Sequence, residues 1–454
     1  MKIAPSVPGF SGLLKAAVQA LAIMGSTVVA AQPVQPAPDT VKDGFTFAAA
    51  GDMIGPEGPV LQYRDPGTLA VQKLLSGADM AFANQEGAIF DLDAFAGYPA
   101  AENGGGHPVS FPAEAADIKA LGIKMVSQAN NHATDFGVEG MAATSRVLDN
   151  AGIAHAGAGP SLTAARAPVY VKTDRGVVAL VAAAGTFTDL SVAADAKPEE
   201  GFKARPGLSP LHTRPTILVT ESQMAALREI ASRTGEPAPE NAGADLTLGQ
   251  SSFRIGTVAG ITYPLDAGDE AAVLASVKEA RARADLVVFS IHAHEMASAA
   301  SDETRPADYL QPMFHKLVDA GADVIVRHGP HDLQGVEIYK GRPIFYGMGS
   351  LMFEVGDMNH HFRGSTLPDS WYDSAIAVSE FRKGQVSIVR IYPFVQNEQD
   401  LRLKGTPKVA SHQDAQRILG RIKALSVPFG TKVAIEGDVG VIRLGAPAAP
   451  ESWR

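Results

Sequence analysis

The feature that most constrains the fold of this chain is a regular alternation of apolar runs and amphipathic stretches that begins at Gly44. The first three apolar runs are "FTFAAAGDMIG", "ADMAFANQEGAIF" and "IKMVSQANNH", and each is followed by a stretch with helical spacing of its apolar residues. Because strands that alternate with helices form sheets covered by helices, this order predicts an α/β architecture. The chain has 454 residues, of which 46% are hydrophobic and 19% charged, so it has ample material for such a core.

Several elements have clear local signals. Residues 65–77 are expected to form a helix, with Asp65 as N-cap, a proline in the first turn and a glycine at the end. A β-hairpin is predicted for residues 169–186 and another for 375–396. Between about residues 187 and 261 the alternation weakens into a Pro-rich, polar stretch with one expected helix, and no second run of core strands is apparent. We interpret that stretch as an inserted loop or lid of the main domain.

The N-terminus predicts a secretory signal peptide over residues 1–31. Lys2 and Lys15 precede an apolar run, and small residues at Val29 and Ala31 fit a cleavage site. The alternative is an N-terminal tail without a targeting role. The expected organisation is a signal peptide at 1–31, a Pro-rich lead-in at 32–43, a main domain at 44–400 and a C-terminal helix and strand extension at 401–454.

Composition excludes several classes of function. Processing after residue 31 removes two lysines and no acidic residue, which changes the formal net charge from −10 to −12 and argues against a nucleic-acid partner. The chain has no cysteine, which excludes disulfides, thiolate metal sites and a lipoprotein anchor. No segment after the signal peptide is long and apolar enough to span a membrane. We therefore expect a periplasmic or secreted protein.

Histidine and carboxylate residues gather at the ends of predicted strands. Singly, each is explained by a polar side chain that caps a strand. Together they favour a metal site, because imidazole nitrogens and carboxylate oxygens suit a divalent cation such as Mn, Fe or Zn, and two cations can share one carboxylate. The residues concerned are Asp52, Glu86, His132, His292, His294, His328 and His331.

Five blocks of sequence, in this order, resemble the CapA family, which is named for capsule and poly-γ-glutamate synthesis and belongs to the calcineurin-like metallophosphoesterase superfamily. The blocks are "GDMIG", "FANQEGAI", "VSQANNHATDFGVEGMAATSRVLDNAGIAHAGAG", "VVFSIHAHE" and "ADVIVRHGPHDLQGVEIYKGRPIFYGMGS". The resemblance implies a four-layer fold of two β-sheets flanked by helices, with a two-metal centre at the strand ends. It makes 44–400 the CapA-like domain.

The resemblance also implies roles for single residues. Glu86 matches the bridging carboxylate, with Asn84 as a nearby polar partner or extra ligand. His132 matches the general acid, and Asp135 is expected to orient it. Asn130 is expected to bond to the backbone. The implied metal ligands are Asp52, Glu86, Asn131, His292, His328 and His331.

Three departures from the superfamily pattern affect the ligand set. Ile54 stands where the superfamily has a ligand histidine. The last histidine pair is spaced His-x-His in the superfamily, but "HGPH" from His328 to His331 here. Where the family commonly has a tryptophan after the fourth-strand histidine, this chain reads "HAHE", so that His294 or Glu295 is expected to supply the missing ligand.

Two further positions bear on substrate contacts. Ser350 replaces an asparagine that the family often has. In the predicted lid, Arg205, His212 and Arg214 lie within one Pro-Gly-rich stretch, "FKARPGLSPLHTRPT". They are expected to be either a solvated basic loop or an anion clamp for the substrate.

Two functions are consistent with these observations. The first is a secreted metal-dependent hydrolase, phosphoesterase-like, that acts on an anionic envelope or capsule substrate of poly-γ-glutamate type. The alternative is a capsule-polymer binding or export component without hydrolytic activity. In either case the capsule-synthesis machinery is an expected partner.

Overall fold

The structure, a computed structural model, describes residues 40–55, 61–100, 106–235, 245–257, 260–297, 305–354, 368–397, 400 and 402–444. The predicted signal peptide and the lead-in up to residue 39 lie outside these residues. Within the described part of the chain, two large mixed sheets carry the strands predicted from the alternating pattern.

The first large sheet has ten strands in the order β23-β24-β21-β20-β1-β2-β5-β6, and β19 and β22 pair with β1 and β21. Strands β1, β2, β5 and β6 are mutually parallel, as the β-α-β order predicts. The predicted hairpin near residue 384 is confirmed as β20 and β21. Strands from the C-terminal extension complete one edge of this sheet. The strands are β1 (Phe45–Ile54), β2 (Met80–Gln85), β5 (Ile123–Ser127), β6 (Ala154–Ala156), β19 (Ser350–Phe353), β20 (Asp373–Arg382), β21 (Gln385–Gln396), β22 (Pro407–Val409), β23 (Ala434–Glu436) and β24 (Val439–Arg443).

The second large sheet has six strands in the order β17-β18-β16-β15-β9-β8. Strands β9, β15, β16 and β18 are parallel, and β8 and β9 form the first predicted hairpin. The carboxyl ends of β15 and β16 lie side by side, because His292 pairs with His328 in the register of the two strands. The strands are β8 (Val169–Thr173), β9 (Gly176–Ala184), β15 (Leu286–His292), β16 (Val324–His328), β17 (Val336–Tyr339) and β18 (Arg342–Phe345).

Side chains that alternate along each strand divide the interior into separate apolar layers. Phe45 and Phe47 of β1 belong to the core between the sheets, whereas Ala48 belongs to the core on the outer face of the first sheet. In β9, Leu180 faces the shared core and Val181 the outer core of the second sheet. Successive strand residues point to opposite faces, so near-continuous apolar runs indicate strands covered on both sides.

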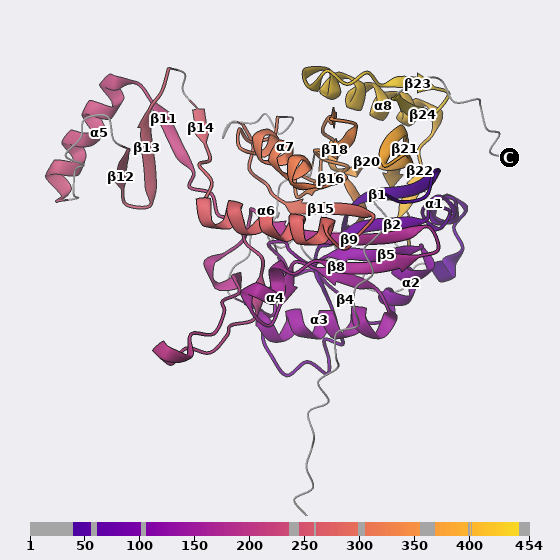
Figure 1. The fold of residues 1–454 in the computed structure, drawn as a ribbon, viewed down its shortest axis with the longest axis horizontal. Helices are drawn as coiled ribbons and strands as arrows, with labels where there is room; N and C mark the ends of the chain where they lie inside the picture. Colours follow the sequence, from indigo (N-terminus) through magenta and orange to yellow (C-terminus); the bar gives the residue numbers. More distant parts are fainter. Residues whose placement is uncertain are drawn as a thin grey trace, which may run out of the picture. The chain divides into compact units, whose positions relative to one another are not determined.

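Helices cover the two outer faces and complete four layers. The outer core of the first sheet takes in residues of α1 (Pro66–Ser76), α2 (Glu114–Ala120) and α3 (Gly137–Ala151). The outer core of the second sheet takes in α6 (Ala267–Arg281) and α7 (Leu310–Ala320). Figure 1 shows α6 along β9 and β15. The four-layer arrangement expected of a calcineurin-like metallophosphoesterase is thus confirmed.

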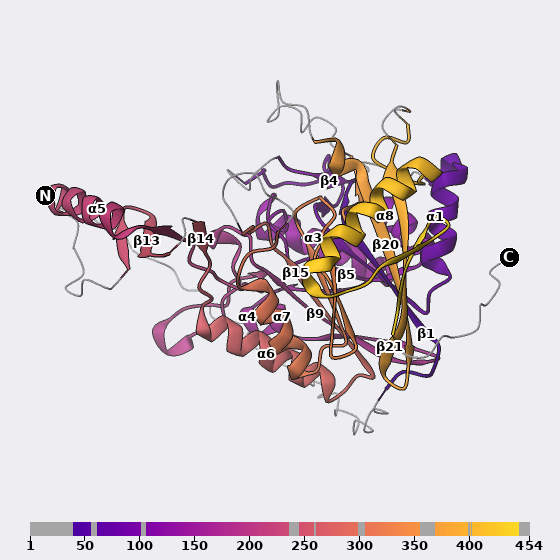
Figure 2. The same cartoon turned by 90° about the horizontal axis from the view of Figure 1, so that it is seen from above.

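The ends of α1 follow the predicted signals. Asp65 caps the helix, because its side chain accepts a hydrogen bond from the backbone N–H of Thr68, and the helix ends before Gly77. The C-terminal helix α8 (His412–Ser426) packs against the core between the sheets and lies along β21 (Figure 2). Its apolar face is Ala415, Ile418, Leu419 and Ile422.

The predicted insertion has more regular structure than expected. Its predicted helix is α5 (Glu221–Thr234), which begins with a capping box of Thr220 and Gln223. The strands that the sequence did not indicate form a four-stranded sheet in the order β12-β13-β11-β14, with a small core of its own. They are three to five residues long and too short to give a clear alternating pattern. The strands are β11 (Thr216–Val219), β12 (Leu246–Leu248), β13 (Ser251–Ile255) and β14 (Gly260–Thr262).

Short elements connect these layers. They are β3 (Ala88–Ile89), β4 (Val109–Ser110), β7 (Ala158–Gly159), β10 (Gly207–Leu208), α4 (Leu162–Arg166) and the 3-10 helices Leu61–Tyr63, Asp189–Ser191, Pro198–Glu200, Asp369–Tyr372 and Val427–Phe429.

One buried carboxyl group outside the strand ends predicts a pH-dependent stability. Glu114, the first residue of α2, is fully buried, and burial together with the charges of Asp117 and Glu354 raises its pKa to about 8. The folded state therefore keeps a proton that the unfolded chain releases above its ordinary pKa of 4.5, so stability is lost as the pH rises from 4.5 to 8. Glutamine at this position removes the titration.

We expect Glu114→Gln to be increasingly stabilising, relative to the parent, as the pH rises through that window. The stability gained by Glu114→Gln over the parent should be about 2–4 kcal/mol larger at pH 8 than at pH 4.5, since one pKa unit corresponds to about 1.4 kcal/mol. Urea unfolding at several pH values measures it. Glu139→Gln, at an exposed position in α3, is the control. Parallel stability profiles for Glu114→Gln and the parent would contradict the expectation.

Candidate metal centre

Strand ends from both large sheets supply the predicted ligands. Asp52 lies near the end of β1 and pairs in register with Asn84 of β2, while Glu86 follows β2 directly. His292 and His328 end β15 and β16 of the second sheet. Since the carboxyl ends of parallel strands form the edge where ligands bind, the two sheets present their polar side chains to one centre.

Asp52 is the most contacted carboxylate of the centre. It is 1% exposed, and its Oδ1 accepts a hydrogen bond from Asn84 Nδ2 at 2.8 Å. Its Oδ2 accepts one from the backbone N–H of Gly329 at 3.2 Å and lies 3.5 Å from Nδ1 of His331. Burial opposes ionisation, but His331 and the other neighbouring histidines outweigh it and hold the pKa of Asp52 well below its usual range. Asp52 is therefore a stable anion in this site.

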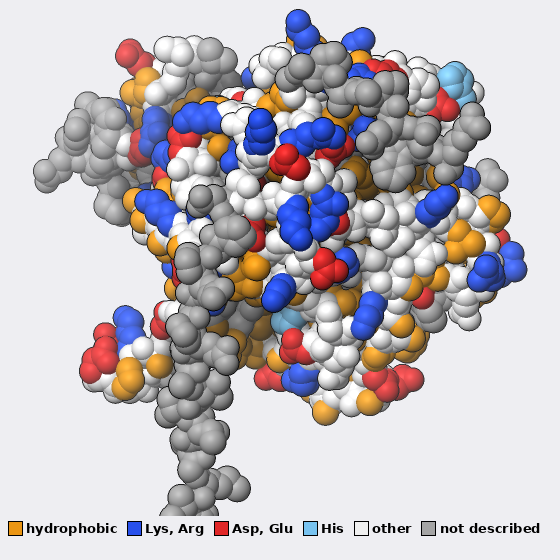
Figure 3. Space-filling view, turned by 45° about the vertical axis from the view of Figure 1, so that its right-hand side comes forward, with side chains coloured by type: hydrophobic (Ala, Val, Ile, Leu, Met, Phe, Trp, Pro, Cys, Tyr) orange, Lys and Arg blue, Asp and Glu red, His pale blue; other side chains and the backbone are white. Residues whose placement is uncertain are grey.

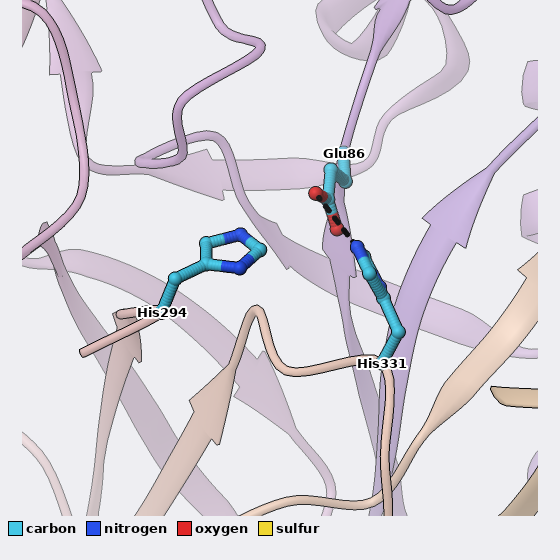
Figure 4. Close-up of side chains that lie close together, drawn as sticks. All are labelled: Glu86, His294 and His331. Atoms are coloured by element: carbon cyan, nitrogen blue, oxygen red, sulfur yellow. Dashed lines mark ion pairs between the residues drawn. The ribbon is translucent and has the colours of Figure 1, made fainter. Parts of the chain in front are cut away.

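Glu86 lies in the middle of the centre. Its Oε1 is 3.5 Å from Nε2 of His292, 3.8 Å from Nε2 of His331 and 4.0 Å from Nε2 of His132. Figure 4 shows the His331 ring directed at this carboxylate. The side chain is fully buried, and neither oxygen has a hydrogen-bond partner among the described residues. Burial and the charges of Asp52 and Asp135 raise the pKa of Glu86 well above its usual range.

These features fit a bound cation. A buried carboxylate without hydrogen bonds is strongly disfavoured in its charged form unless a positive charge compensates it. Two sets of three side chains bring their ligand atoms within 4.8 Å of one another, and Glu86 belongs to both. Such sharing is what a carboxylate that bridges two cations requires. The sets are Asp52, Glu86 and His292, and Glu86, His294 and His331.

His292 and His328 are suited to coordination in the neutral state. Burial lowers the pKa of His292 well below its usual range and that of His328 to about 4. Nδ1 of His328 is buried without a hydrogen-bond partner among the described residues and lies 3.8 Å from Oδ1 of Asp52. Its Nε2 lies 3.1 Å from the hydroxyl of Ser290. Metal-ligating histidines are typically anchored through one ring nitrogen while the other coordinates, and Ser290 can anchor Nε2 of His328 in this way.

His132 and Asp135 form a pair beside this centre. Nδ1 of His132 lies 2.8 Å from Oδ2 of Asp135, and both side chains are buried. Asn130 braces the turn, because its Oδ1 accepts a hydrogen bond from the backbone N–H of His132 and its Nδ2 donates to the backbone oxygen of Gln85. Asn131 lies between these residues and is 8% exposed. The structure thus brings His132 to within 4.0 Å of Glu86 and supports its position through Asn130 and Asp135.

The departures in sequence have structural counterparts. Ile54 is buried in an apolar cluster with Phe353, against which Trp371 and Tyr372 pack. It therefore forms part of an apolar wall on one side of the centre. The Ser350 hydroxyl lies 3.3 Å from Nδ1 of His331, which gives a polar contact at the position where the family often has asparagine.

Several contributors were not predicted from the sequence. The Trp371 ring packs against the His331 ring at 5.1 Å between centroids. Ser290 anchors His328, and the backbone N–H of Gly329 binds Asp52. Ser290 and Gly329 lie within the quoted sequence blocks, but those blocks assign them no role, so only the tertiary contacts identify them.

The three predicted substrate-binding residues are not brought together as a clamp. Arg205 is exposed and donates to the backbone oxygens of Val192 and Asp189. His212 pairs with Asp269 of α6 at 2.5 Å. Arg214 donates to hydroxyls of the small sheet, at Ser252 and Thr247. Each of the three is engaged by its own part of the chain. On the face shown in Figure 3, basic side chains are interspersed with acidic ones.

The four-layer fold, with a buried cluster of carboxylate and imidazole groups at its strand ends, is the arrangement of the calcineurin-like metallophosphoesterase class that the sequence resembles. Within that class, the chain belongs to the family described as bacterial capsule synthesis protein PGA_cap, whose model matches residues 40–355. In the part of the chain that the structure describes, we find no helix long and apolar enough to cross a membrane.

Three similar proteins match this chain over different shares of its length. A protein of Sinorhizobium fredii called uncharacterized protein y4sH is 37% identical over 439 residues, which cover 89% of this chain and 94% of that protein. The PGA biosynthesis protein CapA of Bacillus subtilis is 27% identical over 53% of this chain and 45% of its own length. The capsule biosynthesis protein CapA of Bacillus anthracis is 26% identical over 66% of this chain and 53% of its own.

Among solved structures, a phosphatase of Mycoplasma pneumoniae aligns with a TM-score of 0.37 and 11% identity, covering 78% of this chain and 94% of that chain. A protein of Thermus thermophilus aligns with a TM-score of 0.40 and 11% identity, covering 78% of this chain and 100% of that chain.

Proposed function

We propose that the protein is an exported, metal-dependent hydrolase that cleaves a phosphoester, or a related ester or amide bond, in an anionic envelope or capsule substrate of poly-γ-glutamate type. The observation that carries the proposal is the position of Glu86, which is shared by two ligand sets and lies 4.0 Å from the His132 ring. The names of the CapA relatives support the substrate class. The proposed location is the periplasm or the medium, with the capsule-synthesis machinery as partner.

The proposed ligands would hold two divalent cations, Mn, Fe or Zn, which polarise the scissile bond and activate a water molecule when bound. The ligands are Asp52, Glu86, Asn131, His292, His328 and His331, with Asn84 fixing Asp52 through the 2.8 Å hydrogen bond.

The His132–Asp135 pair performs the proton transfer in this proposal. Nδ1–H of His132 donates to Asp135, which leaves Nε2 directed at the metal centre. As the oxygen of a water molecule bonds to the substrate and the scissile bond breaks, the protonated ring gives its Nε2 proton to the leaving oxygen or nitrogen. The Asp135 carboxylate stabilises the charged ring beforehand. Because both side chains are buried, water is largely excluded from the donor.

The direct test is hydrolysis of 4-nitrophenyl phosphate and of bis(4-nitrophenyl) phosphate by the mature protein, before and after metal removal and with manganese restored. We expect activity that is lost with the metal and regained with manganese, and that is absent in Asp52→Asn. Metal-loaded protein that hydrolyses neither probe, nor poly-γ-glutamate, would favour the capsule-polymer binding or export component instead.

A prediction that does not depend on turnover concerns metal content. We expect the mature protein to bind one to two equivalents of a divalent transition metal, because two ligand sets share Glu86. Elemental analysis of the purified protein, and of protein reloaded after chelation, measures the stoichiometry. Protein that neither retains metal nor takes it up again would rule out the centre.

A further inference from the structure

A side chain at position 329 would collide with the ring of His294 beside the metal centre. A Cβ atom added to Gly329 would lie 3.1 Å from Cδ2 of His294 and 3.1 Å from the carbonyl carbon and oxygen of Ala293. The backbone of Gly329 has a φ of +114°, which a side chain rarely allows. Position 329 is also where a His-x-His pair that ends at His331 would place its first histidine.

We propose that His294 is a metal ligand that takes over the role of a histidine at position 329, an inference that rests on the proposed metal-dependent function. This metal ligand would then come from the turn after β15 instead of the turn after β16. The absence of a side chain at Gly329 leaves the room that the imidazole of His294 occupies.

The ring geometry supports coordination. Nε2 of His294 lies 3.1 Å from Nε2 of His292, and the side chain also falls in a set with Glu86 and His331 (Figure 4). The ligand atoms of His294, Glu86 and His331 lie within 4.8 Å of one another, as the ligands of one cation must. The 3.1 Å contact with His292 joins this set to the second set, which contains His292.

The turn that carries His294 is held on both sides. The guanidinium of Arg327, which is fully buried, donates to the backbone oxygens of Ala293 and Glu295 at 3.0 Å each. The backbone N–H of His294 donates to the hydroxyl of Thr186 at 2.7 Å. These hydrogen bonds fix the backbone before, at and after the proposed ligand, as a ligand that must hold its direction requires.

The neighbouring Glu295, the other candidate from the sequence, is directed elsewhere. Its Oε1 accepts a hydrogen bond from the Thr186 hydroxyl and its Oε2 one from the Tyr309 hydroxyl, both at 3.1 Å. Since both carboxylate oxygens are engaged in this network, the structure favours His294 over Glu295 as the ligand.

The test is metal binding to chelator-treated protein, measured by calorimetric titration with Mn²⁺ or Zn²⁺ and by the visible spectrum of the Co²⁺ form. We expect His294→Ala to weaken one of the binding equivalents by at least about tenfold and to change the Co²⁺ spectrum. Glu295→Gln should keep both, and His155→Ala, at a histidine paired with Asp149 away from the centre, is the matched control.

His294→Gln keeps the volume of the side chain and serves if the alanine variant does not fold. The metal-free variants should unfold at the temperature of the metal-free parent, which separates a ligand from a packing residue. If the parent binds two equivalents of metal and the His294 variants bind both equivalents as tightly as the parent, the role of His294 is overturned and the proposed function is not. A parent that binds no metal would instead overturn the proposed function.

Discussion

We expect His132→Ala to lower the turnover of a substrate with a poor leaving group by roughly two to four orders of magnitude, while its metal content stays close to that of the parent. The reason lies in the geometry of the ring. Nε2 of His132 lies 4.0 Å from the Glu86 carboxylate, where it can donate a proton to a substrate bound at the metal centre. Its Nδ1 is hydrogen-bonded to Asp135. The ring is thus placed to donate a proton and is absent from both candidate ligand sets.

Asn131→Ala is the informative comparison, because the two residues are adjacent and both buried. An amide oxygen can coordinate a cation but cannot donate a useful proton, so this variant should lose metal affinity and turnover together. The loss in His132→Ala should shrink for 4-nitrophenyl phosphate compared with an alkyl phosphate, since a good leaving group needs little protonation. Asp135→Asn should lower turnover by less than His132→Ala does, because Asp135 acts by positioning the His132 ring.

Kinetics with both substrates and elemental analysis of each variant measure these effects, with His155→Ala as the control histidine. Equal metal loss in the His132 and Asn131 variants would make His132 a ligand. Full activity in both would move the function to polymer binding.

The second large effect is expected at Glu86. Glu86→Gln should weaken binding of both cations by more than about a hundredfold, because one side chain is removed from two ligand sets at once. Loss of either His292 or His331 should affect mainly one equivalent, since each belongs to a single set. The charge at Glu86 therefore couples the two sites.

Thermal unfolding with and without metal makes this difference visible. A cation present at 100 times its dissociation constant stabilises the folded state by about 2.7 kcal/mol per site, so the parent should unfold at a clearly higher temperature when loaded. Glu86→Gln should show almost no metal-dependent shift. Glu337→Gln alters another buried glutamate, which bonds to His315 and Tyr346, and should retain the full shift. A normal shift in Glu86→Gln would contradict the shared role.

Local patterns in the sequence determined the layers of this fold. The alternation of Phe45, Phe47 and Ala48 assigns residues to opposite faces of a strand, because the pleat has a period of two whatever the strand packs against. The cap at Asp65 likewise depends on residues within one turn of helix. Family motifs added the position of each predicted ligand at a strand end, and the parallel register then brought these ends together.

The tertiary structure alone decided which of those side chains meet, and in what state. Arg205, His212 and Arg214 are close in sequence but bind to separate parts of the protein, since neighbours on an extended loop need not share a partner. His294 and Gly329 are 35 positions apart, yet one fills the space that the other leaves. Among the described residues neither oxygen of Glu86 has a hydrogen-bond partner, and the burial of this side chain comes from both sheets at once. No local sequence pattern predicts this, because the electrostatic state of a side chain depends on every segment packed around it.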